Sequence, residues 1–262
     1  MYADERQFEV ERIVLAQGRA AVVDLAKSFN VTTETIRRDL AQLEERGTIR
    51  RVHGGAVMLS KSSRAEKSIA QRVDINARAK AAIADRAMKL LPPTFRGAVA
   101  LDAGTTTALL ADRIARWTPE SPEQSLVVIT HSIAVAAAVA VNPHVEVQLL
   151  GGRLRGVTGA AVGASTLAQL ARIRPDVAFI GANGVHADFG LSTPDDDEAA
   201  VKTALTRGSR RAVALVDASK LGEEALVRFA QLDDLDTLIT DEHPADDLRT
   251  ALETAEVEVL VA

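Results

Sequence analysis

Residues 20–57 read AAVVDLAKSFNVTTETIRRDLAQLEERGTIRRVHGGAV, and this stretch decides the fold of the N-terminal part of the chain. A short helix is expected over residues 24–29, followed by a tight polar turn at Asn30. Thr32 then stands at the N-cap position of a second helix, because its side-chain oxygen can accept a hydrogen bond from the first helical turn. The second helix should run to about Arg46. Two short helices joined by such a turn have the spacing of a helix-turn-helix.

The second helix has one apolar face. Ile36, Leu40 and Leu43 recur at i, i+4 and i+7, so they form a stripe that must pack inward. We expect this stripe to pack on Leu25 and on an earlier helix around residues 13–15. The opposite face of the second helix is polar and remains open to a partner.

That polar face carries residue types that contact DNA. In helix-turn-helix proteins the N-terminal end of the second helix faces base edges in the major groove, where hydroxyl and guanidinium groups bind bases or phosphates. After a C-terminal cap at Gly47, residues 48–57 alternate around Gly54 and Gly55, which predicts a β-hairpin wing. The expected contacts with double-stranded operator DNA are Thr32, Thr33, Thr35, Arg37, Arg38, Arg50, Arg51 and His53. The alternative is an ordinary helical hairpin whose arginines lie on a solvated face.

Composition limits the classes of function. The 262 residues are 47% hydrophobic but only 3% aromatic, so the core should consist of Ala, Val, Leu and Ile. Without cysteine there is no disulfide framework, zinc ribbon or thiol nucleophile, and the five histidines show no metal-binding spacing. We therefore expect neither a metal site nor a cofactor. No apolar run is long enough to span a membrane and the N-terminus does not resemble a signal peptide, so a cytoplasmic protein without a membrane partner is expected.

Charge is distributed unevenly along the chain. Residues 1–60 contain nine Lys and Arg against nine Asp and Glu, whereas residues 61–96 contain nine against three. The helix-turn-helix segment is therefore neutral overall, and its non-specific affinity for DNA phosphates should be modest. Tight binding should need two or more copies on repeated half-sites, so we expect a homo-oligomer, either a dimer or a tetramer.

The segment 59–67, LSKSSRAEK, is polar and basic without a hydrophobic period, which is typical of a linker. A helix is expected over residues 68–90, ended by the two prolines that follow. We therefore divide the chain into a winged helix-turn-helix DNA-binding domain at residues 1–58, the linker, and an effector-binding and oligomerisation domain at residues 68–262.

Beyond residue 95 the chain alternates short aliphatic runs with helical patterns. Such alternation predicts an α/β domain with a Rossmann-like parallel sheet and helices on both faces. Ligands of these sheets bind beyond the carboxyl ends of the strands, so the residues after each run are candidates for a site. The predicted strands are residues 98–101, 126–130, 145–150, 177–180, 212–216, 237–240 and 257–261.

The first strand end reads DAGTTT and leads into a helix expected over residues 108–117. A flexible glycine, three hydroxyls and the N–H groups of a helix N-terminus would form a cradle for a phosphate group. The alternative is that the threonines only cap the helix. The candidate residues are Asp102, Gly104, Thr105, Thr106 and Thr107.

The other strand ends place hydroxyls, glycines, an amide and charges on the same rim. A phosphorylated polyol fits this chemistry, with Lys220 supplying positive charge and Asp102 or Asp217 binding sugar hydroxyls. Each feature has a simpler alternative, because a glycine pair can be a turn, Asp217 a cap and Lys220 a solvated residue. The candidate residues are Thr130, His131, Ser132, Gly151, Gly152, Asn183, Gly184, Asp217 and Lys220.

Glu198 and Lys202 lie four residues apart in a helix that is predicted by the acidic residues of its first turn. If this pair is exposed, it contributes only a few tenths of a kcal/mol. The alternative is that both residues are internal, in the binding pocket or in a contact between subunits.

Residues 31–40 and 51–56 together resemble the signature of the DeoR family of bacterial transcriptional regulators, V-T-x-x-T-I-R-R-D-L followed by R-x-H-G-G-A. The resemblance continues through D-x-G-T-T-T, G-x-N-G and D-x-S-K-x-G, and through residues 192–202, where the family has S-T-x-D-x-x-E-A-x-x-K. It implies a winged helix-turn-helix domain joined to a sensor domain that is similar in fold to ribose-5-phosphate isomerase and binds phosphorylated sugars. His131 stands where the family commonly has Asn.

The resemblance also implies a function. The chain looks particularly similar to family members from high-GC bacteria that control sugar uptake by the phosphotransferase system. We therefore expect a repressor of sugar uptake or catabolism genes, not an enzyme, that a phosphorylated sugar releases from operator DNA, with a fructose phosphate favoured. The alternative is a sugar-phosphate isomerase fused to a DNA-binding arm, in which a carboxylate base and a nearby lysine move a proton.

Overall fold

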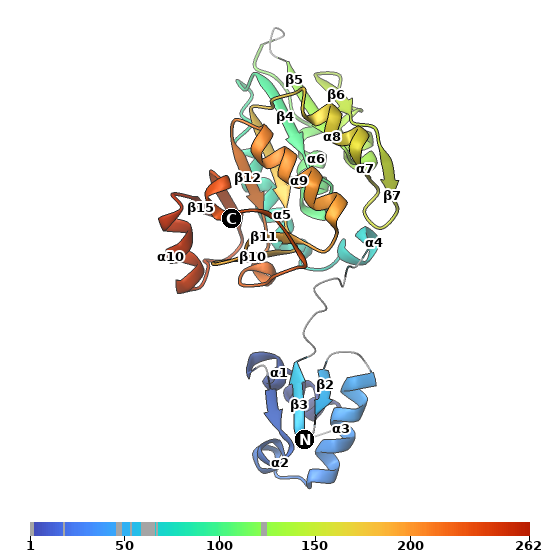
Figure 1. Cartoon of the computed structure of the whole chain (residues 1–262), viewed down its shortest axis with the longest axis vertical. Helices are drawn as coiled ribbons and strands as arrows, with labels where there is room; N and C mark the ends of the chain where they lie inside the picture. Colours follow the sequence, from blue (N-terminus) through green and yellow to red (C-terminus); the bar gives the residue numbers. More distant parts are fainter. Residues whose placement is uncertain are drawn as a thin grey trace. The chain divides into compact units, whose positions relative to one another are not determined.

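A computed structural model describes residues 3–17, 19–45, 49–52, 54–58, 66, 68–121 and 125–262. The chain forms two compact units, residues 1–62 and 63–262 (Figure 1). Three features predicted from the sequence lie outside the described residues: the helix cap Gly47, the wing residue His53, and the predicted linker at residues 59–67 apart from Glu66.

The N-terminal unit combines helices with a small antiparallel sheet whose strand order is β1-β3-β2. Its elements are α1 (Ala3–Gln17), β1 (Arg19–Ala21), α2 (Val22–Phe29), α3 (Thr33–Glu45), β2 (Ile49–Val52) and β3 (Gly55–Met58). The helix-turn-helix is confirmed as α2 and α3, and the wing as β2 and β3. Strand β1 was not predicted, because three residues give no recognisable alternation and its partner lies far along the chain.

The turn between α2 and α3 is held by local hydrogen bonds. Asn30 adopts a left-handed backbone with φ of 51°, and the Val31 amide donates to the Ala26 carbonyl at 3.0 Å. Thr32 Oγ1 accepts a hydrogen bond from the Thr35 amide at 3.2 Å, as an N-cap residue does. The predicted cap therefore begins α3.

The apolar stripe of α3 builds the core of this unit. Ile36, Leu40 and Leu43 are buried together with Leu25 of α2 and Val14 of α1. Burial of one such side chain stabilises the fold by about 1.5–3 kcal/mol. The stripe thus fixes α3 against the other helices, and the polar face of α3 points away from the core.

The C-terminal unit is built on a seven-stranded sheet with the order β15-β14-β12-β9-β4-β5-β6. All of its neighbouring strands are parallel. The strands are β4 (Gly97–Leu101), β5 (Leu126–Thr130), β6 (Val145–Leu149), β9 (Val177–Gly181), β12 (Ala212–Leu215), β14 (Thr237–Thr240) and β15 (Glu258–Val261). They coincide with the seven aliphatic runs, so the predicted parallel sheet is confirmed.

Helices cover both faces of this sheet (Figure 1). Residues of β4 alternate between the faces, since Val99 and Leu101 lie in one buried cluster and Ala100 in the other. The first cluster includes residues of α5 (Ala77–Met88), α6 (Thr105–Ile114) and α7 (Ile133–Val139). The second includes residues of α8 (Ala164–Leu170), α9 (Asp196–Gly208) and α10 (Asp246–Thr254).

The single helix predicted over residues 68–90 is wrong. The structure has two helices here, α4 (Ile69–Arg72) and α5, with a break between them. Asn76 has a left-handed backbone with φ of 53°, a conformation that a continuous right-handed helix does not contain. Its side chain donates to Asp217 Oδ1 at 2.8 Å, so a contact with a distant residue holds the break.

The helix predicted over residues 108–117 also begins earlier than expected. Gly104 is the N-cap of α6, with an extended backbone, and Thr105 is the first helical residue. The three threonines therefore occupy the first turn of α6 instead of a loop before it.

Short antiparallel pairs that were not predicted complete the C-terminal unit. A hairpin joins β7 (Arg153–Arg155) to β8 (Ala160–Val162), and a second sheet has the order β10 (Gly184–His186), β11 (Gly190–Thr193), β13 (Val227–Ala230). Two 3₁₀ turns, η1 (Ala218–Lys220) and η2 (Leu232–Asp234), follow strands. Among the described residues, no helix is both long and apolar enough to cross a membrane.

Candidate functional site

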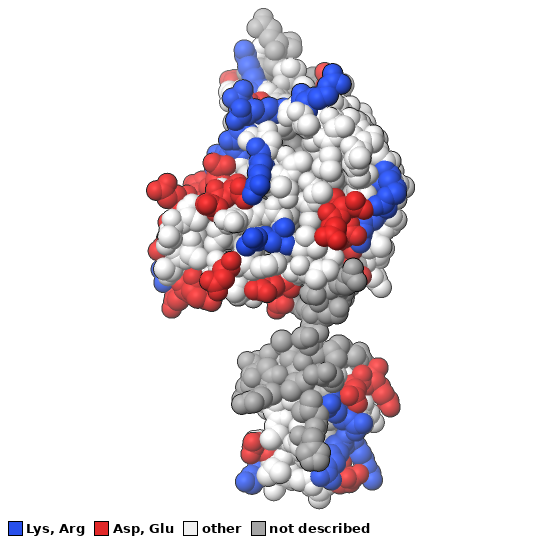
Figure 2. Space-filling view, viewed as in Figure 1, with Lys and Arg blue, Asp and Glu red and all other residues white. Residues whose placement is uncertain are grey.

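The polar face of α3 presents cationic side chains to solvent. The side chains of Arg37 and Arg38 are 62% and 79% exposed, and each is only loosely paired with Glu34, at 3.6 and 3.8 Å. Exposed pairs of this kind contribute little, so both guanidinium groups are available to phosphate or bases. Figure 2 shows blue side chains gathered along this side of the N-terminal unit.

Other predicted DNA contacts have partners of their own. Thr33 is exposed, but the Thr32 and Thr35 hydroxyls lie 2.9 Å apart and form part of the cap. Arg51 donates to Glu44 from its side chain at 2.7 Å and from its amide at 2.9 Å. The hydrogen bond from the Arg51 amide is the main cause that lowers the pKa of Glu44 below its usual range, and the hydrogen bond from the Arg51 side chain adds to it. The Arg50 side chain and His53 lie outside the described residues.

A buried carboxylate that sequence reasoning missed fixes the position of α3. Asp39 accepts hydrogen bonds from Arg6 Nε at 2.6 Å and from Gln7 Nε2 at 3.1 Å, both on α1. Its place three residues after Ile36 puts it beside the apolar stripe, which was the signal available in the sequence. Asp39 therefore orients the helix and does not itself face DNA.

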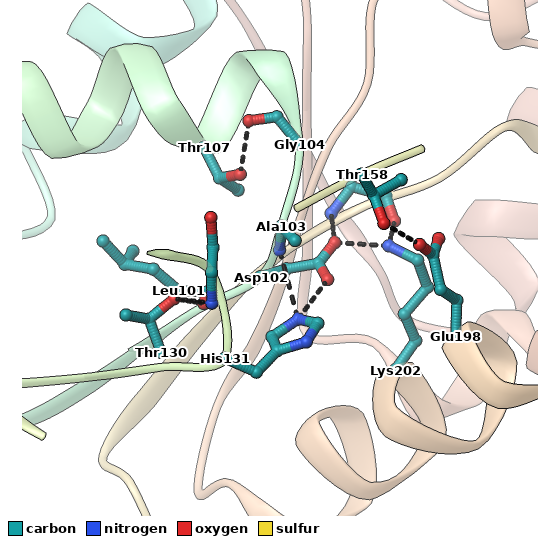
Figure 3. Close-up of polar contacts among 12 residues, drawn as sticks. Leu101, Asp102, Ala103, Gly104, Thr107, Thr130, His131, Thr158, Glu198 and Lys202 are labelled. Carbon is teal, nitrogen blue, oxygen red and sulfur yellow. Dashed lines mark hydrogen bonds and ion pairs between the residues drawn. The ribbon is translucent and has the colours of Figure 1, made fainter. Parts of the chain in front are cut away.

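In the C-terminal unit, Asp102 follows β4 and is fully buried among donors (Figure 3). Its Oδ2 accepts from the Gly181 amide at 2.9 Å and from Lys202 Nζ, and its Oδ1 lies 3.1 Å from His131 Nε2. Burial is the largest single influence and raises the pKa of Asp102, but the charge of Lys202 and the contacts with His131 and Lys202 together lower it below its ordinary value. The carboxylate therefore stays ionised. We call Asp102, His131 and Lys202 the Asp102 cluster.

Lys202 and Glu198 are both buried, so of the two alternatives left open by the sequence the structure has the internal one, and their contact with an effector stays a prediction. Lys202 donates to the Gly181 carbonyl at 2.9 Å and lies 5.6 Å from the ring centre of Phe229, in addition to its bond with Asp102. Glu198 accepts instead from Thr158 Oγ1 (Figure 3). The two residues of the family-like motif thus connect α9 to different partners.

Arg155 joins Glu198 to the segment that precedes α4. Its guanidinium group donates to Glu198 Oε1 at 3.1 Å and to Glu66 Oε1 at 3.0 Å, and its Nε lies 3.2 Å from Asp195. The hydrogen bond with Glu66 is the main cause that raises the pKa of Arg155, with smaller contributions from Glu198 and Asp195. Arg155 was not predicted because its partners lie far from it in the sequence, at Glu66 and at the start of α9.

His131 links two loops beside Asp102. Its Nδ1 lies 2.9 Å from the Ala161 carbonyl, which can only accept, so Nδ1 carries a proton. Its Nε2 lies 3.2 Å from the Ala103 amide and 3.1 Å from Asp102 Oδ1. A neutral ring accepts from the Ala103 amide, whereas a protonated ring donates to Asp102.

Several predicted site hydroxyls are used inside the protein. Thr107 Oγ1 donates to the Gly104 carbonyl at 3.0 Å, and Thr130 Oγ1 donates to the Leu101 carbonyl at 2.8 Å. Ser132 Oγ accepts from the Val135 amide at 3.3 Å and so caps α7. These groups shape the loops. Thr105 and Thr106 are buried in the first turn of α6, and the phosphate cradle expected at this helix N-terminus stays a prediction.

The predicted glycines have packing roles. A Cβ atom at Gly152 would collide with Thr166 Oγ1, and one at Gly184 would collide with the Glu223 carbonyl. The Gly151 carbonyl accepts from Thr166 Oγ1 at 2.9 Å. Close approach of neighbouring chain segments therefore accounts for Gly152 and Gly184. Asn183 Oδ1 accepts from Thr193 Oγ1 at 3.2 Å.

A second group of charges surrounds Asp217, after β12. Asp217 is buried, accepts from Asn76 Nδ2 at 2.8 Å and Ser219 Oγ at 2.6 Å, and lies 3.6 Å from Lys220 Nζ. Lys80 is also buried, and its Nζ donates to the Arg72 carbonyl at 2.6 Å. A surface cavity lined by Asn76, Ala77, Arg78, Ser219 and Asp241 borders this group.

The cations of this group are not compensated. Burial lowers the pKa of Lys80, and burial together with the charges of Arg72, Lys80 and Lys202 lowers the pKa of Lys220 to about 8. Arg72 Nε and Nη2 are buried without a hydrogen-bond partner in the described part of the chain. Buried donors are almost always paired, so these atoms are candidates for contact with a bound ligand. We call Arg72, Lys80, Asp217 and Lys220 the Asp217 cluster.

Arg72 and Lys80 were not among the residues proposed from sequence. Both lie in the stretch that was predicted as one helix, so nothing in the pattern placed them at the strand ends. The described residues contain no group of His, Asp and Glu side chains arranged to hold a metal ion.

The fold defines a class: a helix-turn-helix unit joined to an α/β unit built on a seven-stranded parallel sheet. The N-terminal part matches the DeoR-like helix-turn-helix domain over residues 6–62, and the C-terminal part matches the DeoR C terminal sensor domain over residues 75–242. The chain belongs to the DeoR family of transcriptional regulators.

Relatives match along nearly the whole length. The HTH-type transcriptional regulator GlpR of Haloferax volcanii is 35% identical over 260 residues, which cover 99% of this chain and 98% of the relative. The glycerol-3-phosphate regulon repressor of Escherichia coli is 29% identical over 244 residues, 93% of each chain. A D-ribose-5-phosphate isomerase structure with phospho-erythronic acid aligns with 54% of this chain and 52% of its own, at 16% identity and a TM-score of 0.38, too low to carry an argument.

Proposed function

We propose that this regulator represses genes of sugar uptake or catabolism and that a phosphorylated sugar releases it from operator DNA. The observation that carries the proposal is the charge of the Asp217 cluster, three cations against one carboxylate. The excess equals the charge of a phosphate dianion, and within the described part of the chain Arg72 has buried donors without a partner, which could bind such a group. The name of the E. coli relative, a glycerol-3-phosphate regulon repressor, supports a phosphorylated polyol as the effector.

The phosphate group and the hydroxyls of the proposed ligand would contact different predicted residues. The phosphate group would lie between the Asp217 cluster and the N-terminus of α6, whose Gly104 cap leaves first-turn N–H groups without a side-chain acceptor. Asp217 and Asn183 would bind hydroxyls. A fructose phosphate remains our preference on the family resemblance alone.

Binding, not turnover, is the role proposed for this site. An isomerase needs a carboxylate that can accept a proton from its substrate. Asp102 is already saturated by Lys202 and the Gly181 amide, and its lowered pKa makes it a weak base. Similarity of fold to an enzyme does not by itself imply catalysis.

Ligand binding would reach the DNA-binding unit through α9. Lys202 of α9 belongs to the Asp102 cluster, and one turn away Glu198 is joined by Arg155 to Glu66, ahead of α4. A shift of α9 on ligand binding would thus move the segment that leads to the helix-turn-helix. Tenfold weaker operator binding requires about 1.4 kcal/mol of coupling between the two sites.

The test is operator binding to DNA upstream of this gene and its neighbours, titrated with a panel of sugar phosphates at fixed salt. Specific binding that one sugar phosphate weakens is the expected result, and absence of specific binding under every condition contradicts it. The Arg37→Ala variant should lose operator binding and keep its affinity for the sugar phosphate. The Lys220→Ala variant should still bind operator DNA, but the sugar phosphate should no longer weaken that binding. Equal loss of both activities in either variant would indicate misfolding or a wrong assignment.

Arg155→Met tests the route between the sites. This variant should retain operator affinity and ligand affinity but respond less to the ligand, because the connection between α9 and Glu66 is lost. A normal response would contradict the proposed route and leave the effector site unaffected.

A further inference from the structure

One surface of the C-terminal unit, formed by α7 and β6, is apolar. Residues 133–141 read IAVAAAVAV, so α7 has no polar side chain on any face. Val135 and Val139 point into the core, whereas Ile133 and Val141 are 50% and 74% exposed. A helix that is apolar all round is normally buried. The exposed face of α7 therefore requires a cover.

Strand β6 extends this surface. It is the last strand in the sheet order, so within the described residues one of its edges pairs with no other strand. Leu149 is 49% exposed, and Val145 and Val147 are half-buried on the side of the sheet that α7 covers. Proteins usually protect such an edge with lysine, proline or a bulge. The sequence of β6, VEVQL, has no lysine and no proline, and Glu146 is its one charged residue. Its pairing with β5 is regular, without a bulge.

At the opposite edge of the same sheet, the neighbouring helix has a charged exposed face. There α10 lies beside β15 (Figure 1), and its exposed face carries Asp246, Arg249 and Glu253. These charges keep that edge in water. An exposed apolar helix is thus a specific property of the β6 edge and not a general property of this sheet.

We propose that α7 and β6 form a two-fold contact with a second copy of this chain, in which β6 pairs antiparallel with the partner's β6. A pair centred on Val147 places Val145 opposite Leu149, and Glu146 opposite Gln148, in both directions. No like charges face each other across this pair. The strand is therefore complementary to itself, and Ala134 and Ala137 allow the two α7 helices to approach closely.

A second copy suits this surface better than an unrelated protein. Residues 133–149 contain a single carboxylate, Glu146, and no lysine or arginine, so this stretch offers little charge that would select a charged partner. The DNA-binding segment, with nine cationic and nine anionic residues in positions 1–60, gains affinity from a second copy on an adjacent half-site. This last reason rests on the proposed operator binding, whereas the apolar helix and the free edge do not.

The first experiment measures the mass of the full chain in solution by light scattering during size-exclusion chromatography. The double variant Ala137→Glu/Val141→Glu should show half the mass of the unmodified protein, because each contact would bury unpaired carboxylates. Leu226→Glu, an exposed apolar residue beside β13, is the matched control and should keep the full mass. An unmodified protein at the monomer mass of 27.9 kDa, or an equal fall in the control, overturns the proposal.

The absence of cysteine from the sequence allows a second test that does not weaken the contact. In the proposed pairing Val147 faces its own copy, with Cα atoms about 4.5–5.5 Å apart, a distance that a disulfide can span. Oxidised Val147→Cys should form a covalent dimer on a non-reducing gel faster than Leu226→Cys. No difference between these variants overturns the proposal. Neither experiment uses DNA or ligand, so failure here leaves the proposed function untouched.

Discussion

The Asp102 cluster lies at the end of β4 and the Asp217 cluster at the end of β12, with β9 between these strands, and the two clusters differ in how their charges are balanced. In the first, one carboxylate meets one lysine, a histidine and a backbone amide. The second has three cations and one carboxylate, and Arg72 Nε and Nη2 have no hydrogen-bond partner among the described residues. A buried charge that is fully paired stabilises the fold, whereas the surplus of positive charge is what the proposed phosphate ligand would balance. The two clusters should therefore respond to mutation in opposite ways.

The largest effect is expected from Lys202→Met. This change leaves the buried Asp102 carboxylate without its counter-charge, which should reduce the free energy of unfolding by about 3–5 kcal/mol. Chemical denaturation measures the loss. Lys220→Met provides the matched control in the Asp217 cluster, and an equal loss in that variant would remove the distinction between the clusters.

The next effect is loss of ligand affinity in Arg72→Met. Hydrogen bonds to charged groups contribute about 1.5–3 kcal/mol, so affinity for the effector should fall about tenfold to a hundredfold. The free energy of unfolding without ligand should stay the same or rise, because buried unpaired donors are removed. Calorimetric titration with the effector, and with inorganic phosphate as a simpler probe, measures this. The exposed Arg78→Met is the control, and a destabilised Arg72→Met with normal affinity would contradict the assignment.

The Asp217 cluster should also respond to pH. Lys220 has a pKa of about 8 in the folded chain, against an ordinary value of 10.5. Phosphate affinity should therefore fall as pH rises through 8. Without ligand the unfolding free energy should rise between these two values, because the unfolded lysine then binds more protons than the folded one. Ligand titrations and denaturation curves measured across this pH range test both effects. In Lys220→Met the phosphate affinity and the unfolding free energy should depend less on pH, and an unchanged pH dependence would show that another group titrates.

The smallest effect is expected from Thr107→Val. The Thr107 hydroxyl donates to the Gly104 carbonyl, so its loss should reduce the unfolding free energy by about 0.5–1.5 kcal/mol and leave ligand affinity unchanged. The original sequence interpretation placed this hydroxyl on the phosphate group. A tenfold loss of affinity in the same calorimetric titration would support that interpretation over the one given by the structure.

Features that depend on local patterns were predictable from the sequence. The apolar stripe of α3 and the seven aliphatic runs each specify an element through its own periodicity, and the strand order then follows from packing. The break at Asn76 was not predictable, because the residues around it include neither glycine nor proline. What stabilises the left-handed conformation of Asn76 is its bond to Asp217, 141 positions away.

The same reason hid half of the site. Asp102 and Lys202 were both candidates, but their mutual contact spans a hundred residues, and the i, i+4 spacing of Glu198 and Lys202 gave no sign that Lys202 pairs with Asp102. Arg72 was not predicted because the break at Asn76, which separates α4 from α5, was not predicted either. Long-range contacts between individual side chains leave no periodic signal, so the rim of the sheet was predictable and its charge balance was not.

The shortness of α4 has a consequence for hydrogen exchange. This four-residue helix has a capping box from Ser68 and Gln71 but no buried residue, so it should open at a lower free energy than the rest of its unit. It also carries Arg72. A ligand that binds only the closed form raises the free energy of that opening in proportion to the logarithm of its concentration. Amide protons of α4 should therefore exchange fast without ligand and slow down on binding, which makes this single turn an intrinsic reporter of occupancy.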